Sequence, residues 1–163
     1  MQAIRRYFGQ HFVHIADSNF MTSGDEYAET VDALKYITNM RFSVNLRPDY
    51  APREMVEMLY KSGVIEFLFG IESASDIVLK AMRKAFRFID VVETLRNIQR
   101  LGIPFIGSYW IVGHPGETHK TAIETLEGLR YLYDNELLFN SYSNVYVPLP
   151  GTEPFENPKK SMA

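Results

Sequence analysis

The stretch Ile103–Thr118, IPFIGSYWIVGHPGET, decides the fold of this chain. Its first part, residues 105–112, is rich in aromatic and β-branched residues, which favour a buried strand. The turn-forming sequence GHPG ends that strand, and a helical pattern begins at Thr121. A strand, a Gly/Pro turn and a helix make the βα unit of a parallel sheet, and ligands bind where such strands end. Gly113 leaves room for a flat ligand against its backbone; the alternative is a glycine-rich turn that binds nothing.

Composition indicates one globular domain. The 163 residues are 46% hydrophobic and 23% charged, which is ordinary for a domain with a real core. A net charge of -3 gives no basic footprint, so nucleic-acid binding is not indicated. No apolar run approaches the ~18 residues of a membrane span. The N-terminal sequence MQAIRRYFGQHF lacks the apolar region of a signal peptide, so we expect a cytoplasmic protein.

The chain contains no cysteine. This excludes disulfides, thiolate zinc sites, a cysteine nucleophile and a cysteine-ligated iron–sulfur cluster held by this chain itself. The four histidines stand apart without clustered carboxylates, so a zinc site is not expected either.

Strand and helix patterns alternate about five times along the chain. The predicted strands cover residues 11–16, 41–46, 64–71, 105–112 and 141–147. The predicted helices cover 25–40, the segment from Pro52 to a C′ glycine at Gly63, 75–82, 90–101 with Asp90 as N-cap, and 121–133. The last turns of a helix over residues 4–10 precede the first strand. Such alternation predicts α/β architecture, a parallel sheet with helices outside, either barrel-like or open.

Apolar stripes on the predicted helices are assigned to the core. Two of these stripes are Met55, Met58 and Leu59 on one helix and Ala122, Ile123, Leu126, Leu129 and Tyr133 on another. Trp110 and Tyr109, in the middle of a strand, are predicted to fill the core or the barrel. The domain is predicted to span residues 1–155, with residues 156–163 as a polar tail.

Five polar or glycine-rich segments follow the five strands, and their order is informative. They are ADSNF at 16–20, RPD at 47–49, GIES at 70–73, GHPGET at 113–118 and PLPGT at 148–152. In this order and spacing they resemble the core of radical S-adenosylmethionine (SAM) enzymes, in particular the branch that often carries a cobalamin-binding domain. The resemblance covers residues 4–155. It implies an incomplete (βα)6 barrel that binds SAM across its strand ends, with radical chemistry and, where cobalamin is present, methyl transfer.

The resemblance also implies positions for the ligand. Asp17 and Asn19 match a strand end near the methionyl part of SAM. Arg47 and Glu72, with Ser73 beside it, match polar positions that face the cofactor or its ribose. The adenine would contact the pairs that end the last two strands, which are Val112 and Gly113, and Leu149 and Pro150.

The chain departs from the family pattern in one decisive respect. Relatives hold a 4Fe-4S cluster on a Cys-x-x-x-Cys-x-x-Cys loop after their first strand, and this chain has neither that strand nor any cysteine. In addition, Ala85 follows Lys84 where many relatives have glycine. We therefore expect weak SAM binding and no radical chemistry from this chain alone. The unpaired strand edge predicts pairing with a missing N-terminal segment, a partner chain or a second copy.

Structural alternatives accompany these assignments. Glu72 either binds a ligand hydroxyl or ammonium group or pairs with Arg47 inside the barrel mouth. Asp17 and Asn19 either contact a ligand or cap the turn that follows them. The alternative to an enzyme is a cluster-free module that binds a nucleotide-like ligand or a partner chain. The substrate is not determined by the sequence.

Overall fold

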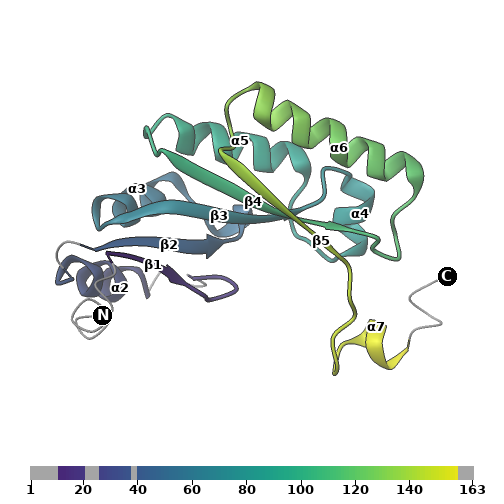
Figure 1. Cartoon of the computed structure of the whole chain (residues 1–163), viewed down its shortest axis with the longest axis horizontal. Helices are drawn as coiled ribbons and strands as arrows, with labels where there is room; N and C mark the ends of the chain where they lie inside the picture. The colour runs from purple at the N-terminus through teal and green to yellow at the C-terminus, as the bar shows by residue number, and fades with distance from the viewer. Residues whose placement is uncertain (1–10, 21–25, 38–39, 158–163) are drawn as a thin grey trace.

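The computed structural model describes residues 11–20, 26–37 and 40–157. Five parallel strands form one curled sheet in the order β1-β2-β3-β4-β5, which gives an incomplete barrel (Figure 1). The strands are β1 Phe12–Ile15, β2 Arg41–Leu46, β3 Val64–Glu72, β4 Phe105–Val112 and β5 Asn140–Val145. The predicted α/β half-barrel is thus confirmed, and β2 and β4 match their predicted bounds.

Each of the strands β1 to β4 leads into helical structure that returns the chain to the other end of the sheet. The helical elements are α2 Glu26–Lys35, η1 Pro48–Tyr50, α3 Arg53–Lys61, α4 Asp76–Ala81, α5 Phe88–Gln99, α6 His119–Asp134 and α7 Glu153–Glu156. Helices α4, α5 and α6 lie along one face of the sheet, and α7 follows the end of β5 (Figure 1). The predicted helix over residues 4–10 and most of the predicted tail lie outside the described residues.

The core lies between the sheet and its helices. Phe67, Phe69 and Ile71 of β3 are fully buried, and they belong to the same apolar cluster as Leu95 and Ile98 of α5. Burying a side chain of this size stabilises the fold by about 1.5–3 kcal/mol. The alternation of the strands places Glu66, Leu68 and Tyr109 on the opposite, concave face.

Helix boundaries differ from prediction where capping decides them. Asp90 is not the N-cap of α5, because the helix begins at Phe88 and Arg87 is its N-cap. The Asp90 carboxylate instead accepts a hydrogen bond from the backbone N–H of Arg87 at 2.8 Å. This contact and the Arg87 guanidinium lower the pKa of Asp90. Gly63 follows α3 with φ of 103°, as a C′ glycine requires.

Two predicted apolar stripes are wrong in part. On α3 the buried residues are Met55, Val56 and Leu59, whereas Met58 is 43% exposed. On α6 the buried face consists of Thr121, Thr125, Gly128 and Leu132. Ile123, Leu126 and Tyr133 of the predicted stripe are exposed.

Small residues on α6 allow a close approach to its neighbours. A Cβ at Gly128 would lie 2.2 Å from the Cβ of Ala74 and 3.0 Å from the Phe88 ring. Thr125 Oγ1 lies 2.7 Å from the buried Ser73 Oγ. The helix therefore packs through short side chains, through Leu132, and through polar contacts of Thr125 with Ser73 and of Glu124 with Ser75. Large apolar residues alone do not mark this face.

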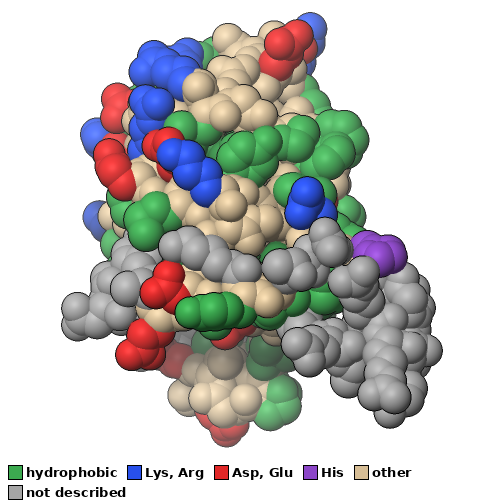
Figure 2. Space-filling view, turned by 90° about the vertical axis from the view of Figure 1, so that its left-hand side faces the viewer, with side chains coloured by type: hydrophobic (Ala, Val, Ile, Leu, Met, Phe, Trp, Pro, Cys, Tyr) green, Lys and Arg blue, Asp and Glu red, His purple; other side chains and the backbone are tan. Residues whose placement is uncertain are grey.

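The end of the sheet where the strands begin is drawn in Figure 2. Lys and Arg side chains lie there among Asp and Glu side chains, with hydrophobic groups between them. In the part of the chain that the structure describes, no helix is long and apolar enough to cross a membrane.

Candidate functional site

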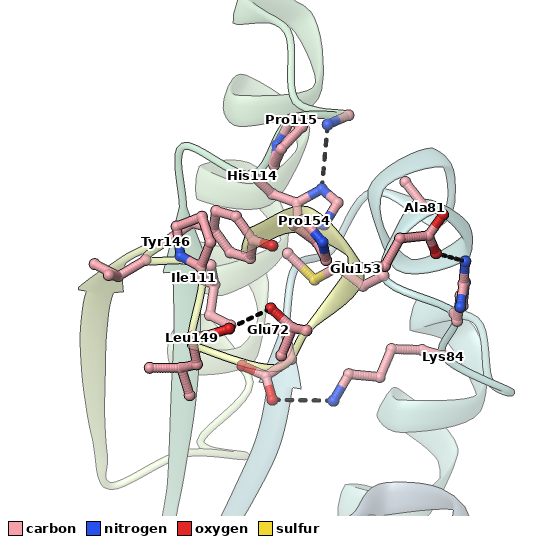
Figure 3. A pocket seen from close by; sticks show the side chains of 16 residues that line it. Glu72, Ala81, Lys84, Ile111, His114, Pro115, Tyr146, Leu149, Glu153 and Pro154 are labelled. Atoms are coloured by element: carbon pink, nitrogen blue, oxygen red, sulfur yellow. Dashed lines mark hydrogen bonds and ion pairs between the residues drawn. The ribbon is translucent and has the colours of Figure 1, made fainter. Parts of the chain in front are cut away.

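A pocket of about 790 Å³ opens where β3, β4 and β5 end (Figure 3). This volume falls in the range of small-molecule sites. The lining residues come from the end of β3, the end of α4, the loop after β4 and the segment after β5. Among the lining residues are Glu72, Lys84, Ile111, His114, Tyr146 and Leu149.

Glu72 ends β3 in an unusual backbone conformation. Its φ is 70°, and the pairing of β3 with β4 shifts register between Gly70 and Glu72. A non-glycine residue in the left-handed region is strained, and such residues gather at functional sites. Gly70 makes room for the side chain, since a Cβ there would lie 2.8 Å from Glu72 Oε1. The bulge therefore turns the Glu72 carboxylate toward the pocket.

Lys84 is the partner of Glu72, with Nζ 3.0 Å from Oε1. Only 17% of the Lys84 side chain and 15% of the Glu72 side chain are exposed. The predicted pairing of Glu72 with Arg47 is wrong, because Arg47 forms a two-pronged contact with Asp49 at 3.0 and 2.7 Å. The hydrogen bond from Arg47 to Asp49 raises the pKa of Arg47. Asp49, two positions along the chain, thus binds the Arg47 guanidinium, and Glu72 on β3 does not.

The GHPGET loop after β4 is held by its own side chains. Gly113 adopts φ of 79°, and its N–H donates to Glu117 Oε2 at 2.6 Å. The N–H of Gly116 donates to His114 Nδ1 at 3.1 Å. Thr118 is the N-cap of α6 and accepts from the N–H of Thr121. Three side-chain contacts thus fix the loop as a rigid rim of the pocket.

A segment after β5 closes the other side of the pocket. Leu149 O accepts a hydrogen bond from Thr152 Oγ1 at 2.6 Å, which forms a tight turn. Glu153 of α7 then contacts Arg83 beyond α4, with Oε2 2.6 Å from Nη2. Tyr146 packs edge-on against the His114 ring, with centroids 4.9 Å apart. The pocket wall therefore joins residues that lie 70 positions apart in the sequence.

The predicted site residues fall into separate groups. Glu72 and Leu149 line the pocket, and Gly113 lines a neighbouring hollow of about 510 Å³. Val112 pairs with Val145 and is 40% exposed, and Pro150 follows Leu149 in an exposed turn. Ser73 does not face the pocket, because its hydroxyl is fully buried against Thr125.

Asp17, Asn19 and Arg47 form a second cluster, at the ends of β1 and β2. Asp17 Oδ1 accepts from the N–H of Asn19 at 3.1 Å. Asn19 Oδ1 accepts from the N–H of Arg47 at 3.2 Å. The Asp17 side chain therefore caps the turn that follows β1, as the structural alternative expects. The Asn19 side chain does something else, because it joins this turn to the backbone at the end of β2.

Sequence reasoning missed several residues of the pocket. Nothing in the sequence assigns Lys84 or Tyr146 to a site, and His114 is considered there only as a metal ligand. Lys84 stands 12 residues after Glu72, across α4, so only the folded chain reveals the pair. In the part of the chain that the structure describes, no group of His, Asp and Glu side chains could hold a metal ion.

Comparison with known proteins agrees with this geometry. The family model described as "Radical SAM superfamily" matches residues 1–129. The chain therefore belongs to the radical SAM superfamily. Among curated relatives, tRNA-2-methylthio-N(6)-dimethylallyladenosine synthase of Ehrlichia canis is 35% identical over 118 residues. That match covers 67% of this chain and 25% of the relative. The Nitrosomonas eutropha enzyme of the same name is 31% identical over 139 residues, or 80% of this chain and 30% of the relative.

Solved structures show the same fold at low identity. The radical SAM methyltransferase TsrM from Kitasatospora setae, with cobalamin and a [4Fe-4S] cluster bound, matches with a TM-score of 0.71. The identity is 18%, over 91% of this chain and 28% of that one. Coproporphyrinogen III oxidase (HemN) from Escherichia coli, a radical SAM enzyme, gives a TM-score of 0.71 at 14% identity, covering 86% and 32%. This chain thus spans about a quarter to a third of the length of these relatives.

Proposed function

We propose that this chain is the SAM-binding part of a radical SAM domain and that its strand-end pocket holds the adenosyl group. The observation that carries this proposal is the Glu72–Lys84 pair, held by a strained bulge at the mouth of the half-barrel. Strain of this kind persists where the surrounding structure fixes it, and it marks functional positions. The pocket also has the size and the apolar walls of a nucleoside site.

The residues present suit an adenosyl group. The Glu72 carboxylate accepts hydrogen bonds from ribose hydroxyls or from an ammonium group, and the contact with Lys84 Nζ at 3.0 Å orients it. Ile111 and Leu149 provide apolar walls for a flat ring and exclude water from it. The backbone at Gly113 has no side chain to obstruct a ligand. The cluster of Asp17, Asn19 and Arg47 at the ends of β1 and β2 would lie toward the methionyl end.

The 4Fe-4S cluster of the family does not fit the residues of this chain. Its ligands are thiolates, and the sequence contains no cysteine. In the complete assembly those thiolates must come from outside these 163 residues. The names of the relatives, a methylthio-forming synthase and a methyltransferase, favour transfer of a one-carbon or methylthio group as the overall reaction. A cytoplasmic location stays a prediction.

A titration calorimetry experiment with S-adenosylhomocysteine tests the pocket. We expect saturable but weak binding at one site, because the anchor that a cluster gives the ligand is absent. Glu72→Gln should weaken binding about ten- to hundredfold, since a charge-assisted hydrogen bond contributes about 1.5–3 kcal/mol. Glu127→Ala, on the exposed side of α6, is the matched control and should bind as the wild type does. Absence of binding in the wild-type chain would exclude this function.

The second candidate function is a partner-binding module, favoured by the edge of β1. Within the described residues β1 pairs with β2 alone, so its other edge carries unpaired backbone groups. Such an edge pairs with a further strand. Sedimentation of the purified chain at several concentrations checks this. A concentration-dependent dimer would support pairing with a second copy. A monomer at all concentrations would count against such pairing and would leave SAM binding as the remaining candidate function.

A further inference from the structure

His114 has a fixed orientation in the rim of the pocket. Its Nδ1 accepts the N–H of Gly116 at 3.1 Å, so Nδ1 carries no proton in this arrangement. A neutral imidazole has one protonated nitrogen, and in His114 that nitrogen is Nε2. The loop contact therefore selects one tautomer, in which Nε2–H is a donor.

The surroundings keep this ring neutral and in place. Burial lowers the pKa of His114, while Glu117 in the same loop acts weakly in the opposite sense. The Tyr146 ring packs edge-on against it, at an interplanar angle of 71°. The other charged groups that line the pocket are Glu72, Arg83, Lys84 and Glu153, and these occur as the two ion pairs described above. Among the described residues, Nε2 has no hydrogen-bond partner.

The two polar sides of the pocket are complementary. Figure 3 shows His114 above the pocket and Glu72 below it, with apolar side chains between them. Glu72 is an acceptor and suits the hydroxyl groups of a ribose. His114 is a donor and suits an acceptor nitrogen or oxygen. A nucleoside carries both kinds of group, the acceptors on its ring and the hydroxyls on its sugar.

We propose that His114 is a ligand-binding residue whose Nε2–H donates a hydrogen bond to an acceptor atom of the adenosyl ring system. This rests on the proposed function, because it needs the adenosyl group in the strand-end pocket. The hydrogen bond from the Gly116 N–H to His114 Nδ1 then has two effects. It stabilises the turn, and it places the proton on Nε2, where it can be donated to the ligand.

Two substitutions separate these consequences. In His114→Asn the side-chain oxygen takes the place of Nδ1 and accepts from the N–H two residues on, as asparagine does in turns. This variant keeps the loop and loses the donor. In His114→Gln the longer side chain carries an N–H near the position of Nε2 but no acceptor for Gly116. This variant keeps the donor and loses the loop contact.

Both variants and the wild type are titrated with S-adenosylhomocysteine, and their Tm values are measured without ligand. His114→Asn should bind about three- to tenfold more weakly, the usual effect of one hydrogen bond. Both variants lose the ring contact with Tyr146, so the Tm of His114→Asn should fall less than that of His114→Gln, which also loses the loop contact. His114→Gln should lower the Tm and bind within about twofold of the wild type. A ¹H–¹⁵N spectrum of the imidazole should show the wild-type ring protonated at Nε2.

The outcomes separate this inference from the proposed function. Wild-type binding with undiminished affinity in His114→Asn would overturn the role of His114 and leave the pocket assignment intact. A ring protonated at Nδ1 would overturn it as well, whatever the ligand does. Lack of binding in the wild type would remove both. A loss of affinity confined to His114→Gln would mean that the loop matters and the donor does not.

Discussion

The two faces of β4 differ although neighbouring residues of one strand form them. Trp110 faces the helices and is 1% exposed, with its Nε1–H donating to the buried Ser108 Oγ at 2.7 Å. Tyr109, one residue earlier, faces the concave side and packs against Tyr142 with ring centroids 5.5 Å apart. Tyr142 itself is 47% exposed. The helix-covered face of β4 is therefore closely packed, while its concave face is more exposed.

Truncation of Trp110 tests this comparison with the largest expected effect. Trp110→Ala should lower the free energy of unfolding by about 3–5 kcal/mol, because it leaves a large cavity under the helices. Trp110→Phe is the matched control and should cost clearly less, since most of the volume remains. Urea denaturation followed by circular dichroism measures both. A cost below about 1 kcal/mol for the alanine variant would show that the helix face is not the stable one.

The close approach of α6 gives a second and smaller effect. Gly128→Ala should destabilise the protein by about 1–3 kcal/mol, because the new methyl group would overlap the Ala74 side chain. In an exposed helix position the same change stabilises by up to ~1 kcal/mol. The sign of the stability change therefore shows whether α6 packs closely at this position. Thermal unfolding of Gly128→Ala beside Glu127→Ala decides it. A raised Tm for the Gly128 variant would mean that α6 does not press on Ala74.

How far the sequence predicts these features depends on whether a local signal exists. The strand Phe105–Val112 is predicted to the residue, because an apolar run between a proline and a glycine has no competing interpretation. The buried face of α6 is not predicted, because three of its four buried residues are the small Thr121, Thr125 and Gly128, with Leu132 as the fourth. Hydrophobic periodicity reports large apolar side chains, whereas close packing of a helix selects small ones.

Sites are harder to predict than elements for the same reason. The motif GIES places Glu72 at a strand end correctly, but the alternative to ligand contact names Arg47 as its partner, and the structure has Lys84 there. Asp49 lies two residues from Arg47 in the chain, and it forms the ion pair with the Arg47 guanidinium. Lys84 lies close to Glu72 only in the folded chain, because α4 reverses the direction of the backbone between them. Likewise His114 shows no sign of its tautomer in the sequence, since that depends on a backbone N–H two residues away.

On the concave face a truncation should be nearly silent for stability. Tyr142→Ala should cost about 0.5–1 kcal/mol, the value of one aromatic pair, because the ring is half exposed and lies on the last strand of the sheet. Tyr142→Phe keeps the ring and should equal the wild type within error. Denaturant unfolding measures this difference, and a cost as large as that of Trp110→Ala would erase the contrast between the two faces.

The smallest effect concerns pH and the rim of the pocket. Because burial lowers the pKa of His114 in the folded state, the unfolded chain binds a proton more readily near its ordinary value of about 6.5. Stability from this group is therefore complete above that value and declines as the pH falls toward the folded-state pKa. Protonation also removes the acceptor for the N–H of Gly116.

We expect the Tm of the wild type to fall slightly more between pH 7.5 and 5.5 than that of His114→Asn, because the asparagine side chain at position 114 does not take up a proton. Asp90, whose folded pKa is also lowered, titrates below this window and should contribute equally to both proteins. Identical pH profiles would mean that protonation of His114 does not weaken the loop, and that the bond from the Gly116 N–H adds nothing measurable to stability.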